Sequence, residues 1–136
     1  MTGTEDRDAI RALIETYADA VFCRDGDAWA ATWAEDASWD LLGNTIEGRD
    51  RILATWREAM SPYSFVGFFC QPGPIALDGD SGDGRVWVRE TLVSSEDGSR
   101  LDLFGRYDDR YTRTANGWRF AHRTYRIWHQ LQGGLS

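Results

Sequence analysis

The sequence predicts one α+β domain, a cone-shaped barrel in which three N-terminal helices pack on a curved, mostly antiparallel sheet. Two observations carry this prediction. Residues 6–60 place apolar side chains mainly at helical spacing, and residues 65–128 form β-rich runs joined by turns. With 136 residues, 42% of them hydrophobic, the chain can build one core, so residues 1–136 are expected to be a single domain. Helices on one face of a curved sheet leave a conical space that can hold one small ligand.

The first helix is predicted over residues 6–24, where apolar side chains recur at steps of three and four. This apolar stripe consists of Ile10, Leu13, Ile14, Tyr17 and Val21. The run from Arg24 to Asp27 predicts the end of the helix, because Gly26 is suited to a left-handed C-cap.

Shorter elements are predicted between this helix and Pro62. In order they are a helix over residues 28–34 with Trp29 and Trp33 inward, a strand over residues 37–41, a turn at Gly43-Asn44 and a helix over residues 51–60. Asp50 is the expected N-cap of the last helix, and Pro62 ends it.

Four strands are predicted after Pro62 from runs rich in β-branched and aromatic residues. They cover residues 65–71, 84–95, 100–114 and 118–128. The segments between them are rich in Gly, Asp, Asn and Ser, and the short ones are typical of antiparallel neighbours.

Three charged residues stand at strand positions where alternation points the side chain inward among apolar neighbours: Asp109, Glu90 and Arg123. Burial of an unpaired charge is costly, so these groups should form pairs or shift their pKa. One interpretation is a structural ion network, in which Arg123 pairs with Asp109 or Glu90 and fixes the sheet register. The other is that they face a ligand.

The charge of the chain disfavours two classes of partner. Lys plus Arg total 15 and Asp plus Glu total 22, a formal net charge of -7. A nucleic-acid binder and a protein that docks on an anionic membrane both need a basic face, so we expect neither partner. The first residues lack a secretion signal, and no apolar run is long enough to span a bilayer. We therefore expect a cytoplasmic protein whose partner is a small-molecule substrate or ligand.

Cysteine and histidine usage predicts neither a disulfide nor a metal site. Cys23 and Cys70 are far apart and lack metal-type spacing, so both are expected to be buried thiols. His122 and His129 fall on opposite faces of one strand by their odd spacing, without a neighbouring His or Cys. No phosphate-binding loop or nucleophile elbow is present, and we expect no cofactor.

Short motifs follow one another in a characteristic order over residues 5–129. They are Ile10-x-x-Leu13-x-x-x-Tyr17-Ala18, Gly26-Asp27-x-Trp29, Trp33-Ala34-Glu35-Asp36-Ala37, Gly48-Arg49, Leu77-Asp78-Gly79-Asp80, Gly105-Arg106-Tyr107-x-Asp109-x-Tyr111 and Asn116-Gly117-Trp118-Arg119-Phe120. In this order the chain resembles the SnoaL-like branch of the nuclear transport factor 2-like fold. It is most similar there to scytalone dehydratase, hexachlorocyclohexane dehydrochlorinase and bile-acid dehydratase relatives. The resemblance implies a pocket between sheet and helices, on a fold that also hosts isomerases, cyclases, epoxide hydrolases and binding modules.

The resemblance also implies a catalytic aspartate at the end of the first helix, paired with a histidine on a later strand. Counting from Tyr17 places Asp25 at the aspartate. The histidine position falls near Phe68, and the sequence has no histidine between residues 63 and 78. Arg123 matches an arginine that several dehydrochlorinase-like relatives carry on the last strand.

These observations predict a cofactor-free lyase or isomerase acting on a small cyclic, mostly apolar molecule. Asp25 would be the general base, Asp109 or Tyr17 would stabilise an oxyanion, and Arg123 would orient Asp25 or a polar substrate group. Asp109 resembles the carboxylic acid of ketosteroid isomerase, which desolvation keeps neutral. The expected substrate-binding residues are Trp39, Trp56, Phe68, Glu90, Tyr107, Tyr125 and, at the pocket mouth, His129.

Two alternatives stay open. The chain could be a non-catalytic small-ligand-binding or assembly module, or an epoxide hydrolase in which Asp25, Arg123 and Asp109 activate water. Strand alternation puts Trp118, Phe120 and Trp128 on the face opposite Arg123. An apolar outer sheet face of this kind predicts a homodimer or homotrimer.

Overall fold

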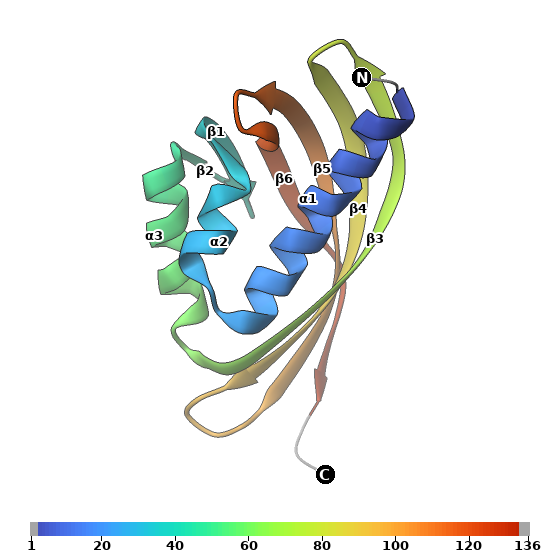
Figure 1. The fold of residues 1–136 in the computed structure, drawn as a ribbon. Helices are drawn as coiled ribbons and strands as arrows, with labels where there is room; N and C mark the ends of the chain where they lie inside the picture. The colour runs from blue at the N-terminus through green and yellow to red at the C-terminus, as the bar shows by residue number, and fades with distance from the viewer. Residues whose placement is uncertain (1–2, 134–136) are drawn as a thin grey trace.

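The computed structural model describes residues 3–133, which form three helices and six strands (Figure 1). The elements are α1 (Gly3–Cys23), α2 (Gly26–Ala31), β1 (Trp33–Leu41), β2 (Asn44–Glu47), α3 (Arg49–Met60), β3 (Tyr63–Asp78), β4 (Ser81–Ser94), β5 (Arg100–Thr114) and β6 (Gly117–Gly133). None of the helices in this described part is long and apolar enough to cross a membrane.

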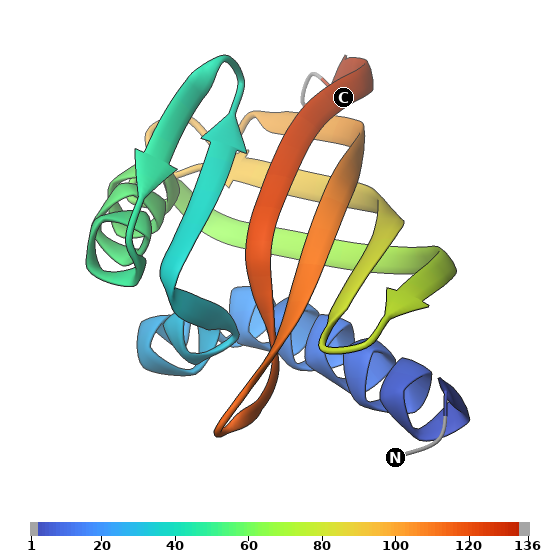
Figure 2. The same cartoon turned by 90° about the horizontal axis from the view of Figure 1, so that it is seen from above.

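The strands form one sheet in the order β2-β1-β6-β5-β4-β3. The β1–β6 pair is parallel and every other neighbouring pair is antiparallel. The helices lie on one side of the sheet, and the long strands curve past α1 (Figures 1 and 2). α1 packs against β3 and β6, and α3 packs against β1. The predicted α+β cone with its mostly antiparallel sheet is confirmed.

The junction between α1 and α2 differs from the prediction. α1 buries the expected stripe, and Arg24 takes the left-handed conformation with φ 54° that was expected for Gly26. Gly26 is instead the first residue of α2, whose N-cap is Asp25. The Asp25 carboxylate accepts a hydrogen bond from the backbone N–H of Ala28 at 3.1 Å, which satisfies one free donor of the helix. Cys23 at the end of α1 is exposed, so the prediction that it is a buried thiol is wrong.

Between α2 and α3 the predicted strand and turn are present as β1 and the bend after it, and they continue into a second strand, β2, that was not predicted. Trp33 begins β1 instead of ending a helix, although it is fully buried as expected. A two-residue turn, Leu42-Gly43, joins β1 to the short strand β2. α3 starts at Arg49, and its N-cap is Gly48. The prediction that Asp50 is the N-cap is wrong.

β6 contains two irregularities that reverse predicted faces. In its pairing with β5, Ala121 and Trp128 have no partner and form β-bulges. Beyond each bulge, the side chains of β6 point to the opposite face from the one that regular alternation predicts. Trp118 and Phe120 are therefore buried on the same side as Arg123, against the prediction that they form an outer face. Only Trp128 of that predicted set is exposed.

Candidate active site

A cavity of about 260 Å³ lies between the sheet and the helices. Its walls come from α1, β1, α3 and strands β3 to β6. The lining residues are Tyr17, Val21, Trp39, Leu41, Leu42, Trp56, Ala59, Met60, Tyr63, Phe68, Glu90, Leu92, Leu101, Leu103, Tyr107, Tyr125, Ile127 and Gln130. This volume is just below the usual range for small-molecule sites, which begins at about 300 Å³. Aliphatic and aromatic side chains dominate the walls.

Seven of the predicted site residues meet at this cavity. They are Tyr17, Trp39, Trp56, Phe68, Glu90, Tyr107 and Tyr125. Helical spacing put Tyr17 and Trp56 on inward faces, and strand alternation did the same for Glu90 and Tyr125. Leu42 and Gln130 were missed, because the β1–β2 turn and the far end of β6 carry no periodic signal.

Glu90 is an acid in a mostly apolar wall. In the register of the sheet it lies between Phe68 on β3 and Leu103 on β5, and its accessible surface faces the cavity. Burial raises the pKa of Glu90 to about 7, and the neighbouring Tyr125 hydroxyl offsets part of that rise. Among the described residues no arginine forms an ion pair with it. A carboxyl with this pKa can both give up and take back a proton near neutral pH.

The other titratable groups of the cavity are mainly tyrosine hydroxyls. Tyr17 and Tyr107 place their hydroxyl oxygens 3.3 Å apart, and both side chains are buried. Burial raises the pKa of Tyr17 to about 12 and raises that of Tyr107 well above its ordinary value. The hydroxyl of Tyr125 is buried outside hydrogen-bond geometry with any described group, although the Glu90 charge acts on it. These hydroxyls stay protonated at neutral pH and are available as donors.

An ion pair lies beneath the tyrosines. Arg123 donates from Nε and Nη2 to the two carboxylate oxygens of Asp109 at 2.7 and 3.0 Å, and the Tyr111 hydroxyl donates to the same carboxylate at 3.0 Å. Burial alone would lower the pKa of Arg123, but the attraction of Asp109 outweighs it and the pKa is raised. The guanidinium carbon lies 3.7 Å from the Tyr107 ring centroid and 4.5 Å from that of Tyr17.

This arrangement decides between the two interpretations of the buried charges. Asp109 and Arg123 form the structural pair, and neither contributes to the lining of the cavity. Against the prediction, Asp109 does not line this cavity, because Arg123 and Tyr111 donate to its carboxylate; burial still raises the pKa of Asp109, and Arg123 opposes that rise.

Two predicted site residues lie away from the cavity. Asp25 is exposed and caps α2, so it is not positioned as a base for a bound ligand. His129 pairs with Phe104 on the outer face of the sheet, because the extra residue at Trp128 shifts the register. Of the three residues expected for an epoxide hydrolase, only Arg123 and Asp109 are brought together, and Asp25 lies apart from them.

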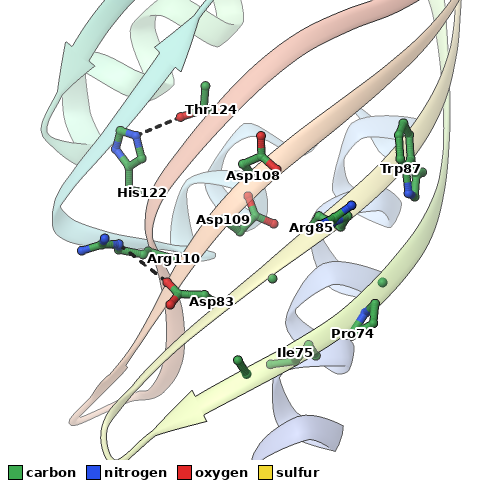
Figure 3. A pocket seen from close by; sticks show the side chains of 13 residues that line it. Pro74, Ile75, Asp83, Arg85, Trp87, Asp108, Asp109, Arg110, His122 and Thr124 are labelled. Atoms are coloured by element: carbon green, nitrogen blue, oxygen red, sulfur yellow. Dashed lines mark hydrogen bonds and ion pairs between the residues drawn. The ribbon is translucent and has the colours of Figure 1, made fainter.

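A second hollow, of about 810 Å³, lies on the outer face of the sheet (Figure 3). It is wide and open, and two of its charged lining residues, Asp83 and Arg110, pair with each other. Asp83 and Arg110 lie 3.7 Å apart with 72% and 74% of their side chains exposed, so water screens their charges. His122 is held by the side chains of Ser38, Asp40 and Thr124. We place the candidate site in the cavity between the sheet and the helices, where burial raises the pKa of a carboxyl group.

Residues 3–133 contain no group of three or more His, Cys, Asp or Glu side chains arranged to hold a metal ion.

Comparisons with known proteins agree with this architecture. A family model described as a SnoaL-like domain matches residues 3–124. A search of curated proteins gave no match. A candidate aromatic ring hydroxylase from Novosphingobium aromaticivorans is 27% identical, with a TM-score of 0.87 over 98% of this chain and 96% of its own.

Two further solved structures resemble the chain in fold alone. A candidate scytalone dehydratase from the same organism is 16% identical, with a TM-score of 0.87 over 98% of this chain and 91% of its own. A type 2 hexachlorocyclohexane dehydrochlorinase (LinA) is 20% identical, with a TM-score of 0.84 over 97% of this chain and 94% of its own.

Proposed function

The chain belongs to the SnoaL-like domain family, and from that premise we propose that it is a cofactor-independent lyase or isomerase for a small cyclic, mostly apolar molecule. One observation carries the proposal. Glu90, with a pKa of about 7, faces a cavity whose other titratable groups are mainly tyrosine hydroxyls. A single carboxyl can then serve as base and as acid, so the missing histidine of the related enzymes is not required.

In the first step, ionised Glu90 removes a proton from a carbon next to a carbonyl group of the substrate. The electron pair of the broken C–H bond moves to the carbonyl oxygen and forms an enolate. A mostly apolar, enclosed wall strengthens the interactions that stabilise this charge.

The enolate oxygen needs hydrogen-bond donors, and Tyr17 and Tyr107 supply them. Their hydroxyls are adjacent, at 3.3 Å, and remain protonated. Arg123 acts through these rings as a positioning residue. Its positive charge beneath the tyrosines makes their hydroxyls better donors by lowering the pKa that burial has raised.

The second step returns the proton from Glu90. In an isomerisation, the protonated carboxyl delivers it to another carbon of the conjugated enolate. In an elimination, the carbonyl re-forms as the bond to a neighbouring hydroxyl breaks, and the hydroxyl leaves as water with the Glu90 proton. The dehydratase and dehydrochlorinase among the similar structures support this chemistry only at the level of a shared fold.

Exchange of substrate protons tests the proposal. Cyclohexanone or 2-tetralone is incubated with the protein in deuterated buffer, and deuterium next to the carbonyl is followed by NMR. We expect catalysed exchange, reduced roughly 100-fold or more in Glu90→Gln. Asp25→Asn, which changes an exposed carboxylate outside the cavity, should exchange like the wild type. If neither ketone exchanges while both still quench the fluorescence of Trp39 and Trp56, the alternative of a non-catalytic binding module is favoured.

A further inference from the structure

The turn between β1 and β2 has an unusual residue at its first central position. Leu41 and Asn44 pair across the turn, and the two residues between them have positive φ, 51° at Leu42 and 92° at Gly43. Such a tight hairpin turn strongly favours Asn, Asp or Gly at both central positions. A leucine there costs free energy, because its Cβ crowds the backbone in the left-handed conformation.

Core packing does not account for this leucine. The Leu42 side chain is 57% exposed, so it is not buried deeply enough in the fold to offset the strain. It does line the cavity. Backbone strain of this kind is retained at ligand-binding positions when the side chain serves the ligand.

Within the mostly apolar cavity, donor hydroxyls lie in the buried part and exposed aliphatic side chains lie at the mouth. Tyr17 and Tyr107, which carry donor hydroxyls, are almost completely buried. Leu42 and Ile127 are lining residues with large exposed fractions, 57% and 37%. A ligand that ended inside the cavity would leave both aliphatic side chains in water.

We propose that Leu42 contacts the substrate, and that this substrate is a ring compound with an apolar extension that leaves the cavity and lies against Leu42 and Ile127. The proposal rests on the proposed use of the cavity as the substrate site. The ring and its carbonyl group occupy the interior beside Glu90 and the tyrosines. The extension covers the mouth, and its burial offsets the strain of the turn.

A series of 4-alkylcyclohexanones, from unsubstituted to 4-butyl, tests the inference. Binding is measured by quenching of the intrinsic fluorescence of Trp39 and Trp56, which line the cavity. In the wild type we expect affinity to rise for each added methylene, by up to roughly fourfold where the methylene is fully buried. Leu42→Asn should lose most of this dependence of affinity on chain length.

Thermal unfolding provides the second readout. Asn tolerates positive φ better than Leu, so Leu42→Asn should raise the melting temperature while it weakens binding of the longer ketones. The control is Leu131→Asn. Leu131 is equally exposed at 56% and does not line the cavity, so the chain-length series should stay unchanged.

An unchanged series in Leu42→Asn overturns the inference, as does the absence of quenching by every ketone or a fall in melting temperature. Failure of the proposed proton-transfer chemistry can be distinguished from failure of this inference. It would remove proton exchange and leave the chain-length dependence and its loss in Leu42→Asn intact.

Discussion

Arg123 and Asp109 form a bidentate ion pair in which the side chains are 1% and 0% exposed. The pair joins β5 to β6, since the two residues are direct partners in the antiparallel register. A guanidinium that is out of water depends on its one carboxylate partner, although the rings of Tyr107 and Phe120 also lie against it. The pair therefore stabilises the packing of β5 against β6 beneath the cavity.

Asp109→Asn should destabilise the fold by about 3–5 kcal/mol, because it leaves the Arg123 charge buried without a counter-charge. Urea unfolding monitored by circular dichroism measures this loss. The matched control is Asp83→Asn, which breaks the exposed pair with Arg110 and should change stability by less than about 0.5 kcal/mol. Similar stability of the two variants would contradict the structural role assigned to the buried pair.

The raised pKa of Glu90 predicts that stability falls as pH rises. Its ordinary pKa is 4.5 and burial raises it to about 7, so between these values the folded state binds more protons than the unfolded state. The resulting stabilisation is complete below pH 4.5 and is lost as pH rises through 7. From about pH 5 to about pH 8, the stability of the wild type relative to Glu90→Gln should fall by about 2 kcal/mol.

Urea unfolding of both proteins at several pH values checks this difference. A constant difference across the range would mean that Glu90 titrates normally. Proton exchange should have the opposite trend and rise through the same pH range, because ionised Glu90 is the proposed base.

Gly105→Ala should deform the cavity wall. An added Cβ would lie 2.5 Å from Cε1 and 2.6 Å from the hydroxyl oxygen of Tyr125, whose ring lines the cavity. Tyr125 is buried against Tyr107 and has little room to move. We expect a loss of about 1–3 kcal/mol in stability and weaker binding of cyclohexanone.

Gly67→Ala is the comparison for this variant. An added Cβ there meets the exposed ring of Phe65 at 3.2 Å, and that ring can move. Equal binding by the two alanine variants would show that the Tyr125 ring is not a fixed part of the wall.

Self-association stays a prediction, now based on Trp128 of the predicted set together with Trp87. On the outer sheet face Trp87 and Trp128 are 37% and 57% exposed, with the Arg106 guanidinium over both rings. Sedimentation velocity should show a dimer or trimer for the wild type and a shift toward monomer for Trp128→Ser. Leu42→Asn, on the other side of the sheet, should sediment like the wild type. A monomeric wild type at micromolar concentration would contradict the expectation.

Much of the fold could be predicted from the sequence, because the spacing of apolar residues indicates which side chains of a helix or strand are buried. α1 and β5 were placed within a few residues by their regular apolar spacing. β2 was missed because a four-residue strand is too short to show alternation. The faces of Trp118, Phe120 and His129 were wrong because alternation assumes a regular strand, and the extra residues at Ala121 and Trp128 leave no signal in composition.

The candidate site shows the same limit. Glu90 could be recognised as the charged residue on an apolar strand face, and it does face the cavity. Asp25 was misplaced because a carboxylate beside a helix end fits two roles in a sequence. It can point into a pocket or cap the next helix, and only the turn at Arg24 decides between them.

The parallel pairing of β1 with β6 has a consequence for synthesis of the chain. β6, which follows the other five strands in the described part of the chain, occupies an interior position of the sheet between β1, the first strand, and β5. The hairpin that carries Trp39 and Leu42 is therefore without its sheet neighbour until β6, residues 117–133, has been synthesised. Such distant pairings fold slowly. Nascent chains truncated before residue 117 should consequently expose aromatic surface to chaperones.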